Sequence, residues 1–249
     1  MPVGGPCGPS RSVLERALMV EAADLFGSNY ELVRELLAEP GEEHTLTRVV
    51  QGVADLVAAC DFAGISIRRG KGRIETPART APIVDDLDGA QYELNEGPCL
   101  DAIRVTDTIV IDDTATDPRW PTWGPRAAEL GARSVLSVRL ATADQLVGGL
   151  NLYSTRTSAF DEDSVQVAHA YAEPASTAVA VVEKVEGLRT GMQTRHLIGM
   201  AQGMLMLRYG LNEEQSFAFL SRTSQQSNVK LRDIAVRVCE EMAAEGWPG

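Results

Sequence analysis

The sequence predicts an α+β domain with an antiparallel sheet and flanking helices, followed by a long helix and a small all-α domain of three helices. Two observations predict this fold class. Between residues 62 and 154, short apolar runs are separated by turns and helical pieces, without the regular strand–helix alternation of a parallel sheet. From residue 161 onward, apolar residues recur at helical spacing instead.

The composition favours a folded chain in the cytoplasm. The 249 residues are 44% hydrophobic and 23% charged, which is enough for one large domain or for a medium and a small one. The start is rich in Gly and Pro and lacks the apolar segment of a secretory signal, and no apolar run approaches the roughly 18 residues of a membrane span. The cysteines lie far apart and only three histidines are present, so reduced thiols are favoured over disulfides or a zinc site.

The first elements are two helices and a hairpin. Residues 12–38 are predicted to be helical because their apolar residues recur about one turn apart. A Pro-Gly pair within residues 39–45 interrupts this pattern, and a second helix is predicted over residues 46–59. Residues 62–74 predict a β-hairpin, because alternating apolar residues lead into a Gly-Lys-Gly turn at residues 70–72.

A helical piece and three strands complete the predicted α+β domain. The helix is expected at residues 81–94 and the strands at residues 108–113, 133–141 and 145–154. The last two strands are joined by Thr-Ala-Asp, a connection short enough for antiparallel neighbours. Their apolar residues either line a cavity for a small molecule or fill a solid core, and the sequence leaves both interpretations open.

Acidic clusters at residues 85–88 and 112–113 resemble metal ligands, but short acidic turns are common in an acidic protein. The sequence therefore predicts no metal site.

Residues 161–209 predict one long helix, with a bend or a break near Pro174. One apolar stripe in this helix is spaced by four, three and four positions, as in the seam of a short coiled coil: Val181, Val185, Leu188 and Met192. Two heptads do not decide between a dimer seam and a stripe that packs on the chain's own sheet.

Three helices are predicted at the C-terminal end. Gly210 is expected to end the first helix as a left-handed cap, and Asn212 to begin the second, with Gln215 in a capping box. Phe217 and Leu220 give the second helix its apolar face. Asn228 is predicted to be the N-cap of the third helix.

Positive charge is concentrated in this C-terminal segment. Residues 189–238 hold seven Lys and Arg against three Asp and Glu, a net charge of +4 in a chain whose total is −12, which leaves −16 for the rest. Because the Debye length is about 8 Å at physiological salt, a polyanion here meets mainly the local positive field. Lys230 and Arg232 are expected in the first turn of the third helix, where cations slightly disfavour the helix unless an anion binds. The alternative is an ordinary solvated surface with pairs such as Asp233 and Arg237.

The segment RHLIGMAQGMLMLRYGLNEEQSFAFLSRTSQQSNVKLRDIAVRV, residues 195–238, resembles the ANTAR domain, an RNA-binding module of bacterial transcription antitermination regulators. The shared positions form an AxGxLM core from Ala201 to Met206 and an RxSQxxNxKLRDxA run from Arg222 to Ala235. Gln202 departs from the family, which usually has Lys there. The resemblance implies that RNA is contacted by residues of all three helices: Arg195, Gln202, Arg208, Arg222, Ser224, Gln225, Asn228, Lys230 and Arg232.

The stretch LNEGPCLDAIRVTDTIVIDDTATDPRWPTW, residues 94–123, resembles a segment of the GAF domain, a small-molecule sensing fold. The signature of cyclic-nucleotide-binding members is absent, and Cys99 precedes Leu100 rather than the His of bilin-attaching members. GAF followed by ANTAR is an arrangement of actinobacterial regulators. It implies an N-terminal tail and helix over residues 1–40, a GAF sensor over 41–180, and a linking helix with the ANTAR domain over 181–247.

The two resemblances together imply a cytoplasmic homodimer that binds two hairpin loops in nascent leader RNA and prevents transcription termination. Its signal would enter through the GAF domain, with no cofactor beyond an unidentified small-molecule ligand, and no membrane is involved.

Two other functions are weighed. Some GAF relatives are thiol-based methionine sulfoxide reductases, and Cys99 is expected near a helix start, which lowers a thiol pKa, with Cys60 as the one candidate resolving thiol. A DNA-binding helix-turn-helix is disfavoured, because the polar connection over residues 223–229 is longer than the 3–4-residue turn of that motif.

Overall fold

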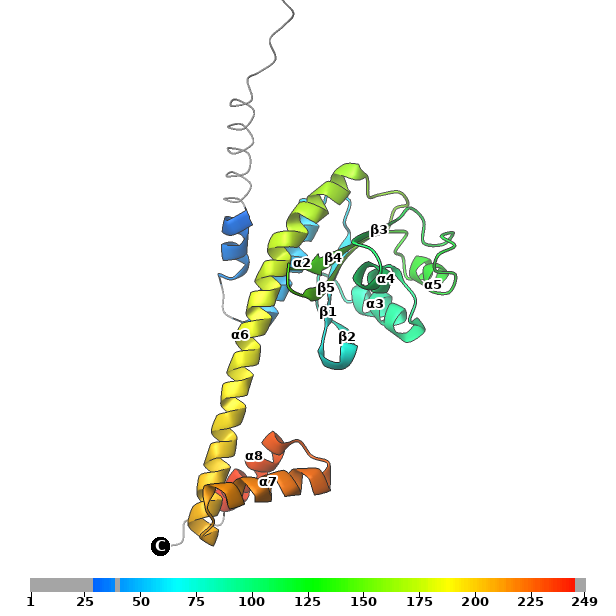
Figure 1. The fold of residues 1–249 in the computed structure, drawn as a ribbon. Coiled ribbons are helices and arrows are strands. Elements are labelled where there is room, and N and C mark those ends of the chain that lie inside the picture. Colours follow the sequence, from blue (N-terminus) through cyan, green and yellow to red (C-terminus); the bar gives the residue numbers. More distant parts are fainter. Residues whose placement is uncertain (1–28, 39–40, 245–249) are drawn as a thin grey trace, which may run out of the picture. The chain divides into compact units, whose positions relative to one another are not determined.

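The computed structural model describes residues 29–38 and 41–244, and the chain divides into two compact units between Glu183 and Lys184. The first unit, the sensor unit, holds the sheet, and the second, the C-terminal unit, holds three helices (Figure 1). Residues 29–36 are helical. The larger part of the helix predicted over residues 12–38 lies outside the described residues.

Five antiparallel strands form one sheet, which confirms the predicted fold class. The strand order is β2-β1-β5-β4-β3. The strands are β1 (Phe62–Arg68), β2 (Ile74–Arg79), β3 (Thr108–Ile111), β4 (Ser134–Ala141) and β5 (Leu146–Ser154). The predicted hairpin is β1 with β2, and its turn is a 3-10 helix at Gly70–Gly72. The Thr-Ala-Asp connection joins β4 to β5 as antiparallel neighbours, as predicted.

The central strands alternate between two faces of different chemistry. On β5, Leu150 and Leu152 belong to an apolar core on one face of the sheet. The alternate residues Asn151 and Tyr153 lie on the opposite face. On β1, the buried Ser66 lies between two buried isoleucines in the same way. One face of the sheet is therefore apolar, and the other carries a layer of buried polar groups.

Helices cover both faces (Figure 1). The apolar face packs against α2 (Glu42–Leu56) and the first part of α6 (Glu162–Tyr209). The polar face is covered by α3 (Ile83–Leu94), α4 (Pro98–Arg104) and α5 (Trp123–Glu129). The predicted helices at 46–59 and 81–94 are confirmed as α2 and α3.

Helix α6 runs without a break through Pro174, so of the predicted bend or break only the break is wrong. Proline removes one backbone hydrogen bond and crowds the preceding turn. Here Ala172 and Ala175 are buried on either side of it, so packing against the sheet fixes the helix across this turn. The Ser176 hydroxyl also donates to the Ala172 carbonyl at 2.5 Å, in the same turn.

The C-terminal unit consists of the end of α6, α7 (Glu213–Ser227) and α8 (Leu231–Ala244). Its small core is formed by one cluster of buried residues from all three helices: Ala201, Leu205, Leu220, Ile234 and Ala235. None of the helices within the described ranges combines the length and the apolar character that crossing a membrane requires.

Candidate nucleic-acid interface

Two short connections fix the course of the three C-terminal helices. Gly210 ends α6 with φ of 64°, a left-handed conformation that glycine adopts at little cost. Asn212 caps α7: its side chain accepts from the Gln215 backbone N–H at 2.8 Å, and the Gln215 side chain accepts from the Asn212 N–H at 3.0 Å. Both predicted caps are confirmed.

Asn228 ends α7 instead of beginning α8, so its predicted N-cap role is wrong. Its φ is 52°, and its N–H donates to the Ser224 carbonyl. Asparagine is the residue after glycine that most often tolerates this left-handed conformation. Helix α8 begins at Leu231, which leaves Lys230 immediately before the helix and Arg232 in its first turn.

Ser224 and Gln225 lie in the last turn of α7, so the predicted seven-residue polar connection is also wrong. The helices are joined by Asn228–Lys230 alone, and the Ser224 hydroxyl closes this connection by donating to the Val229 carbonyl at 2.6 Å. A three-residue connection matches the turn of a helix-turn-helix. Connection length therefore gives no argument against DNA as the target.

The predicted RNA contacts fall into two groups. Residues of the last two turns of α7 and the start of α8 form one group, which we term the α7–α8 corner: Arg222, Ser224, Gln225, Asn228, Lys230 and Arg232. The other group lies on α6. Arg195 and Gln202 are seven residues apart and share one face of that helix, whereas Arg208 is turned by about 120° from Gln202.

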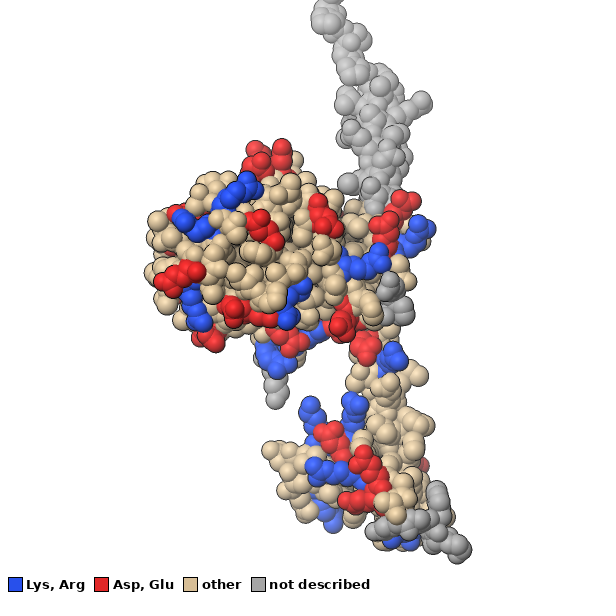
Figure 2. All heavy atoms as spheres, turned by 180° about the vertical axis from the view of Figure 1, so that it is seen from behind, with Lys and Arg blue, Asp and Glu red and all other residues tan. Residues whose placement is uncertain are grey.

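Lys and Arg side chains lie on the surface of both units (Figure 2). In the sensor unit, seven arginines each bind a carboxylate: Arg69, Arg73, Arg79, Arg119, Arg126, Arg133 and Arg139. Four predicted RNA contacts are exposed and form no ion pair with any described residue: Arg195, Arg222, Lys230 and Arg232. The alternative pair of Asp233 with Arg237 is not formed either. Unpaired guanidinium and ammonium groups are the ones that phosphates bind most readily.

The coiled-coil stripe on α6 is exposed. The side chains of Val181, Val185, Leu188 and Met192 are 42%, 56%, 64% and 68% exposed. The stripe is therefore open within the described chain, and its role as a dimer seam stays a prediction.

A buried polar layer between the sheet and α3 is the feature that sequence reasoning missed. At its centre, Asp88 accepts hydrogen bonds from Thr76 at 2.7 Å, from Asn151 at 3.3 Å and from the Tyr153 hydroxyl. Burial raises the pKa of Asp88, and these hydrogen bonds oppose that rise. The sequence carried a partial signal: Ser66 and Asn151 alternate with apolar residues along β1 and β5, which places both on the sheet face opposite the apolar core.

Cys99 lies in α4 near its start, as expected, but the prediction of a lowered pKa is wrong. The thiol is fully buried, and desolvation together with the nearby Asp88 raises its pKa to about 12. Burial likewise raises the pKa of Cys60 to about 12. A buried, protonated thiol is a poor nucleophile. The geometry therefore gives the reductase alternative no support.

The acidic clusters have arginine partners. Asp85 binds Arg79 at 2.7 Å, and Asp113 binds Arg133 at 3.0 Å. Within the described ranges, no group of three or more His, Cys, Asp and Glu side chains is arranged to hold a metal ion.

Arg69 connects three elements of the sensor unit to each other. It follows β1 directly, and its guanidinium binds Glu42 of α2, Glu75 of β2 at 2.9 Å and Glu183 of α6 at 2.6 Å. Glu183 lies on α6 between the first two residues of the exposed stripe. The β1–β2 hairpin is thereby tied to the helix that leads out of the sensor.

Comparison with known families matches both parts of the chain. A GAF domain model matches residues 39–180, and an ANTAR domain model matches residues 186–238. No curated protein matches the chain.

Solved structures share the fold of the sensor. The GAF domain of a phosphoenolpyruvate-protein phosphotransferase from Coxiella burnetii is 17% identical, with a TM-score of 0.50 over 67% of this chain and 98% of that one. A bacteriophytochrome from R. palustris is 12% identical, with a TM-score of 0.51 over 80% of this chain and 46% of that one. A free methionine-R-sulfoxide reductase from Neisseria meningitidis is 14% identical, with a TM-score of 0.49 over 66% and 93%. At these identities the likeness to the first two structures concerns the fold alone.

Proposed function

The chain belongs to the GAF domain family and carries an ANTAR domain behind its sensor, and from this premise we propose that it binds hairpin loops of nascent leader RNA in the cytoplasm. ANTAR is an RNA-binding antitermination domain and GAF is a sensor domain, so the chain regulates transcription in response to a sensed signal. Binding at paired hairpins would keep a terminator hairpin from forming, and the downstream genes would then be transcribed.

The observation that carries this proposal is the set of unpaired cations at the α7–α8 corner. Arg222, Lys230 and Arg232 are exposed without an ion-pair partner among the described residues, on a chain with a net charge of −12. Unpaired loop nucleotides offer phosphates to such cations and base edges to amides such as that of Gln225. The ANTAR match favours RNA over duplex DNA, although the short turn between α7 and α8 fits either.

A homodimer completes the proposal. One corner binds one loop, so a two-hairpin RNA needs two chains, and the exposed stripe from Val181 to Met192 supplies an apolar seam for their association. Linking two binding faces raises the effective concentration at the second loop. We further propose that the Arg69 connection carries the signal from the sensor unit to the start of this seam.

Lys230→Ala and Arg232→Ala are each expected to weaken binding of a two-hairpin RNA by about tenfold, because each removes a charge-assisted contact to phosphate. Each variant is also expected to lower the salt dependence of the binding constant by about 0.7 in the log–log slope. Gel shifts at several salt concentrations measure both quantities. Both side chains are exposed, so the urea midpoint of unfolding should stay unchanged.

Arg126→Ala is the matched control, since it removes one positive charge from the sensor unit and breaks only an exposed pair with Glu93. Equal affinities of wild type and of both α8 variants would contradict the proposed interface. Tighter binding of duplex DNA than of hairpin RNA would contradict RNA as the target.

A further inference from the structure

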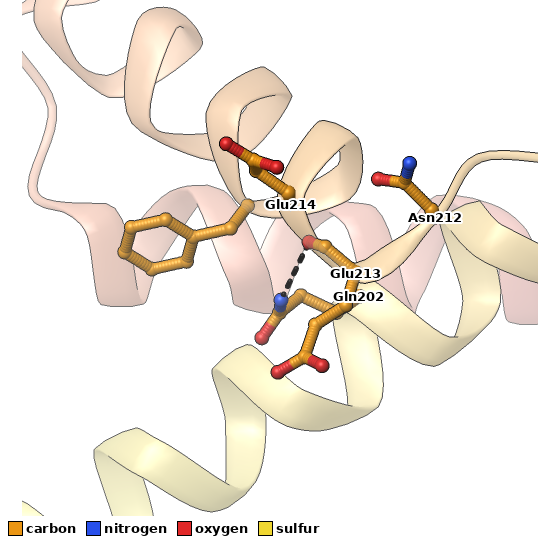
Figure 3. Close-up of a pocket in the computed structure, with 5 residues that line it drawn as sticks. Gln202, Asn212, Glu213 and Glu214 are labelled. Carbon is orange, nitrogen blue, oxygen red and sulfur yellow. Dashed lines mark hydrogen bonds between the residues drawn. The ribbon is translucent and has the colours of Figure 1, made fainter.

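An open pocket lies where the start of α7 crosses α6, away from the α7–α8 corner (Figure 3). Its lining comes from one residue of α6 and four residues at the beginning of α7: Gln202, Asn212, Glu213, Glu214 and Phe217. All five belong to the C-terminal unit. Only Gln202 is among the predicted RNA contacts, so the pocket as a whole has no assigned role.

Phe217 forms an aromatic wall of this pocket. Its side chain is 45% exposed, whereas Leu220 one turn later is fully buried in the core of the unit. The sequence assigned both residues to the inward face of α7, and the structure turns only Leu220 inward. An exposed aromatic ring on an RNA-binding domain offers a surface on which a nucleobase stacks.

The polar groups of the pocket are mainly hydrogen-bond acceptors. The Gln202 Nε2 donates to the backbone carbonyl of Glu213 at 3.2 Å, which fixes the amide and leaves its Oε1 as an acceptor. The carboxylates of Glu213 and Glu214 make no hydrogen bond or ion pair with a side chain in the described chain. Glu214 and Phe217 are three residues apart on α7, so their side chains share one side of that helix.

This combination disfavours a phosphate and favours a base. Two carboxylates repel an anion, and the amide of Gln202 replaces the positive charge that a lysine would bring there. Amino groups on base edges donate to carboxylate and amide oxygens, as cytosine and adenine do in nucleic-acid complexes. Uracil has no amino group, and its one donor on this edge, N3–H, lies between two carbonyl oxygens that the carboxylates repel.

We propose that this pocket holds one unpaired base of the bound RNA loop, stacked on Phe217, with its exocyclic amino group donating to Glu213, Glu214 or Gln202. The occupant is therefore adenine, cytosine or guanine, and uracil binds more weakly. This inference rests on the proposed function and adds sequence preference to it: the α7–α8 corner supplies phosphate affinity, and the pocket reads one base.

The test uses the full chain and a hairpin RNA selected by the wild-type protein from a pool with randomised loops. Phe217→Ala is expected to weaken binding by about 10- to 100-fold, the effect of losing one base–aromatic stack, and Phe217→Trp to retain affinity. The matched control is Phe219→Ala, since Phe219 is 49% exposed on the same helix and outside the pocket. A Phe217→Ala variant that binds as tightly as Phe219→Ala, while Lys230→Ala still weakens binding, would overturn the pocket and leave the proposed function standing.

Base reading is tested by replacing each loop nucleotide with uracil. At one loop position, the uracil replacement should weaken RNA binding strongly for the wild type and only slightly for the double variant Glu213→Ala/Glu214→Ala. The base replacement and the double substitution remove the same contact, so their effects on affinity should not add. If the losses of binding free energy from the uracil replacement and from the double variant add at every loop position, the inference is overturned. A Phe217→Ala variant that binds the single hairpin normally but changes oligomeric state in light scattering would also overturn it, because the ring would then serve a protein contact.

Discussion

Leu188→Asp is expected to lower the apparent affinity for a two-hairpin RNA by about 100-fold, the gain that a bivalent complex brings over a single contact. The substitution places a carboxylate from each chain in the centre of the proposed seam. Two like charges facing each other in an apolar interface are strongly unfavourable. Leu188 is 64% exposed in the single chain, so the fold of the protomer loses no packing. Gel shifts with two-hairpin and one-hairpin RNA, together with the mass in solution, measure the effect.

Affinity for a single hairpin should stay at the wild-type level, because the α7–α8 corner is unchanged. Thr190→Asp provides the control: it adds the same charge at an exposed position on the opposite side of α6. A Leu188→Asp variant that keeps both the dimer mass and the two-hairpin affinity would show that this stripe is not the seam. Loss of single-hairpin binding would point to a damaged domain instead.

The sequence predicted the sheet well because its strands obey a simple rule. Leu136, Val138 and Leu140 of β4 alternate with residues of the other face, as Leu150 and Leu152 of β5 do, and a short connection leaves antiparallel pairing as the simplest arrangement of the two strands. The long helix followed from uninterrupted helical periodicity. The break considered at Pro174 does not occur, because local propensity cannot register the tertiary packing on both sides of this residue.

The candidate site was predicted in its residue types but not in its geometry. Asparagine suits both the N-cap of one helix and the left-handed end of another, so Asn228 alone does not tell which helix it bounds. The structure shows that it ends α7: its φ is 52° and its N–H donates to the Ser224 carbonyl, an arrangement that depends on the three-dimensional course of the turn. Phe217 and Leu220 fit one helical stripe equally well, and only the packing of the three helices buries one and exposes the other.

The polar layer was missed for a different reason. When leucine and isoleucine occupy one face of a strand, serine and asparagine between them are taken to face solvent, because many antiparallel sheets have one solvent-exposed face. Here α3 and α4 cover that side, and Asp88 supplies the acceptors that make burial of Ser66 and Asn151 tolerable. A cover over both faces was implied by the predicted helices, but its polar chemistry was not.

Asp88→Ala is expected to lower the free energy of unfolding of the sensor unit by about 3 kcal/mol, since it leaves several buried donors without their acceptor. Thr76, Asn151 and the Tyr153 hydroxyl all donate to this carboxyl, and in the described chain every buried side-chain nitrogen and oxygen atom has a partner. Urea unfolding followed by far-UV circular dichroism measures the loss. An unchanged midpoint would show that the layer rearranges without cost.

The contribution of Asp88 to the free energy of unfolding should depend on pH, and burial of the carboxyl sets the sign of that dependence. Because burial raises the folded-state pKa of Asp88 above its unfolded value, the folded state binds the proton more tightly than the unfolded chain. The contribution to stability is complete below the unfolded pKa of about 4 and is lost as pH rises through the folded pKa. Asp88→Asn cannot titrate, so the stability of wild type minus that of Asp88→Asn should fall from pH 4 upward and then level off. A difference that rises with pH would mean that the hydrogen bonds from Thr76, Asn151 and Tyr153 outweigh desolvation and hold the carboxylate ionised.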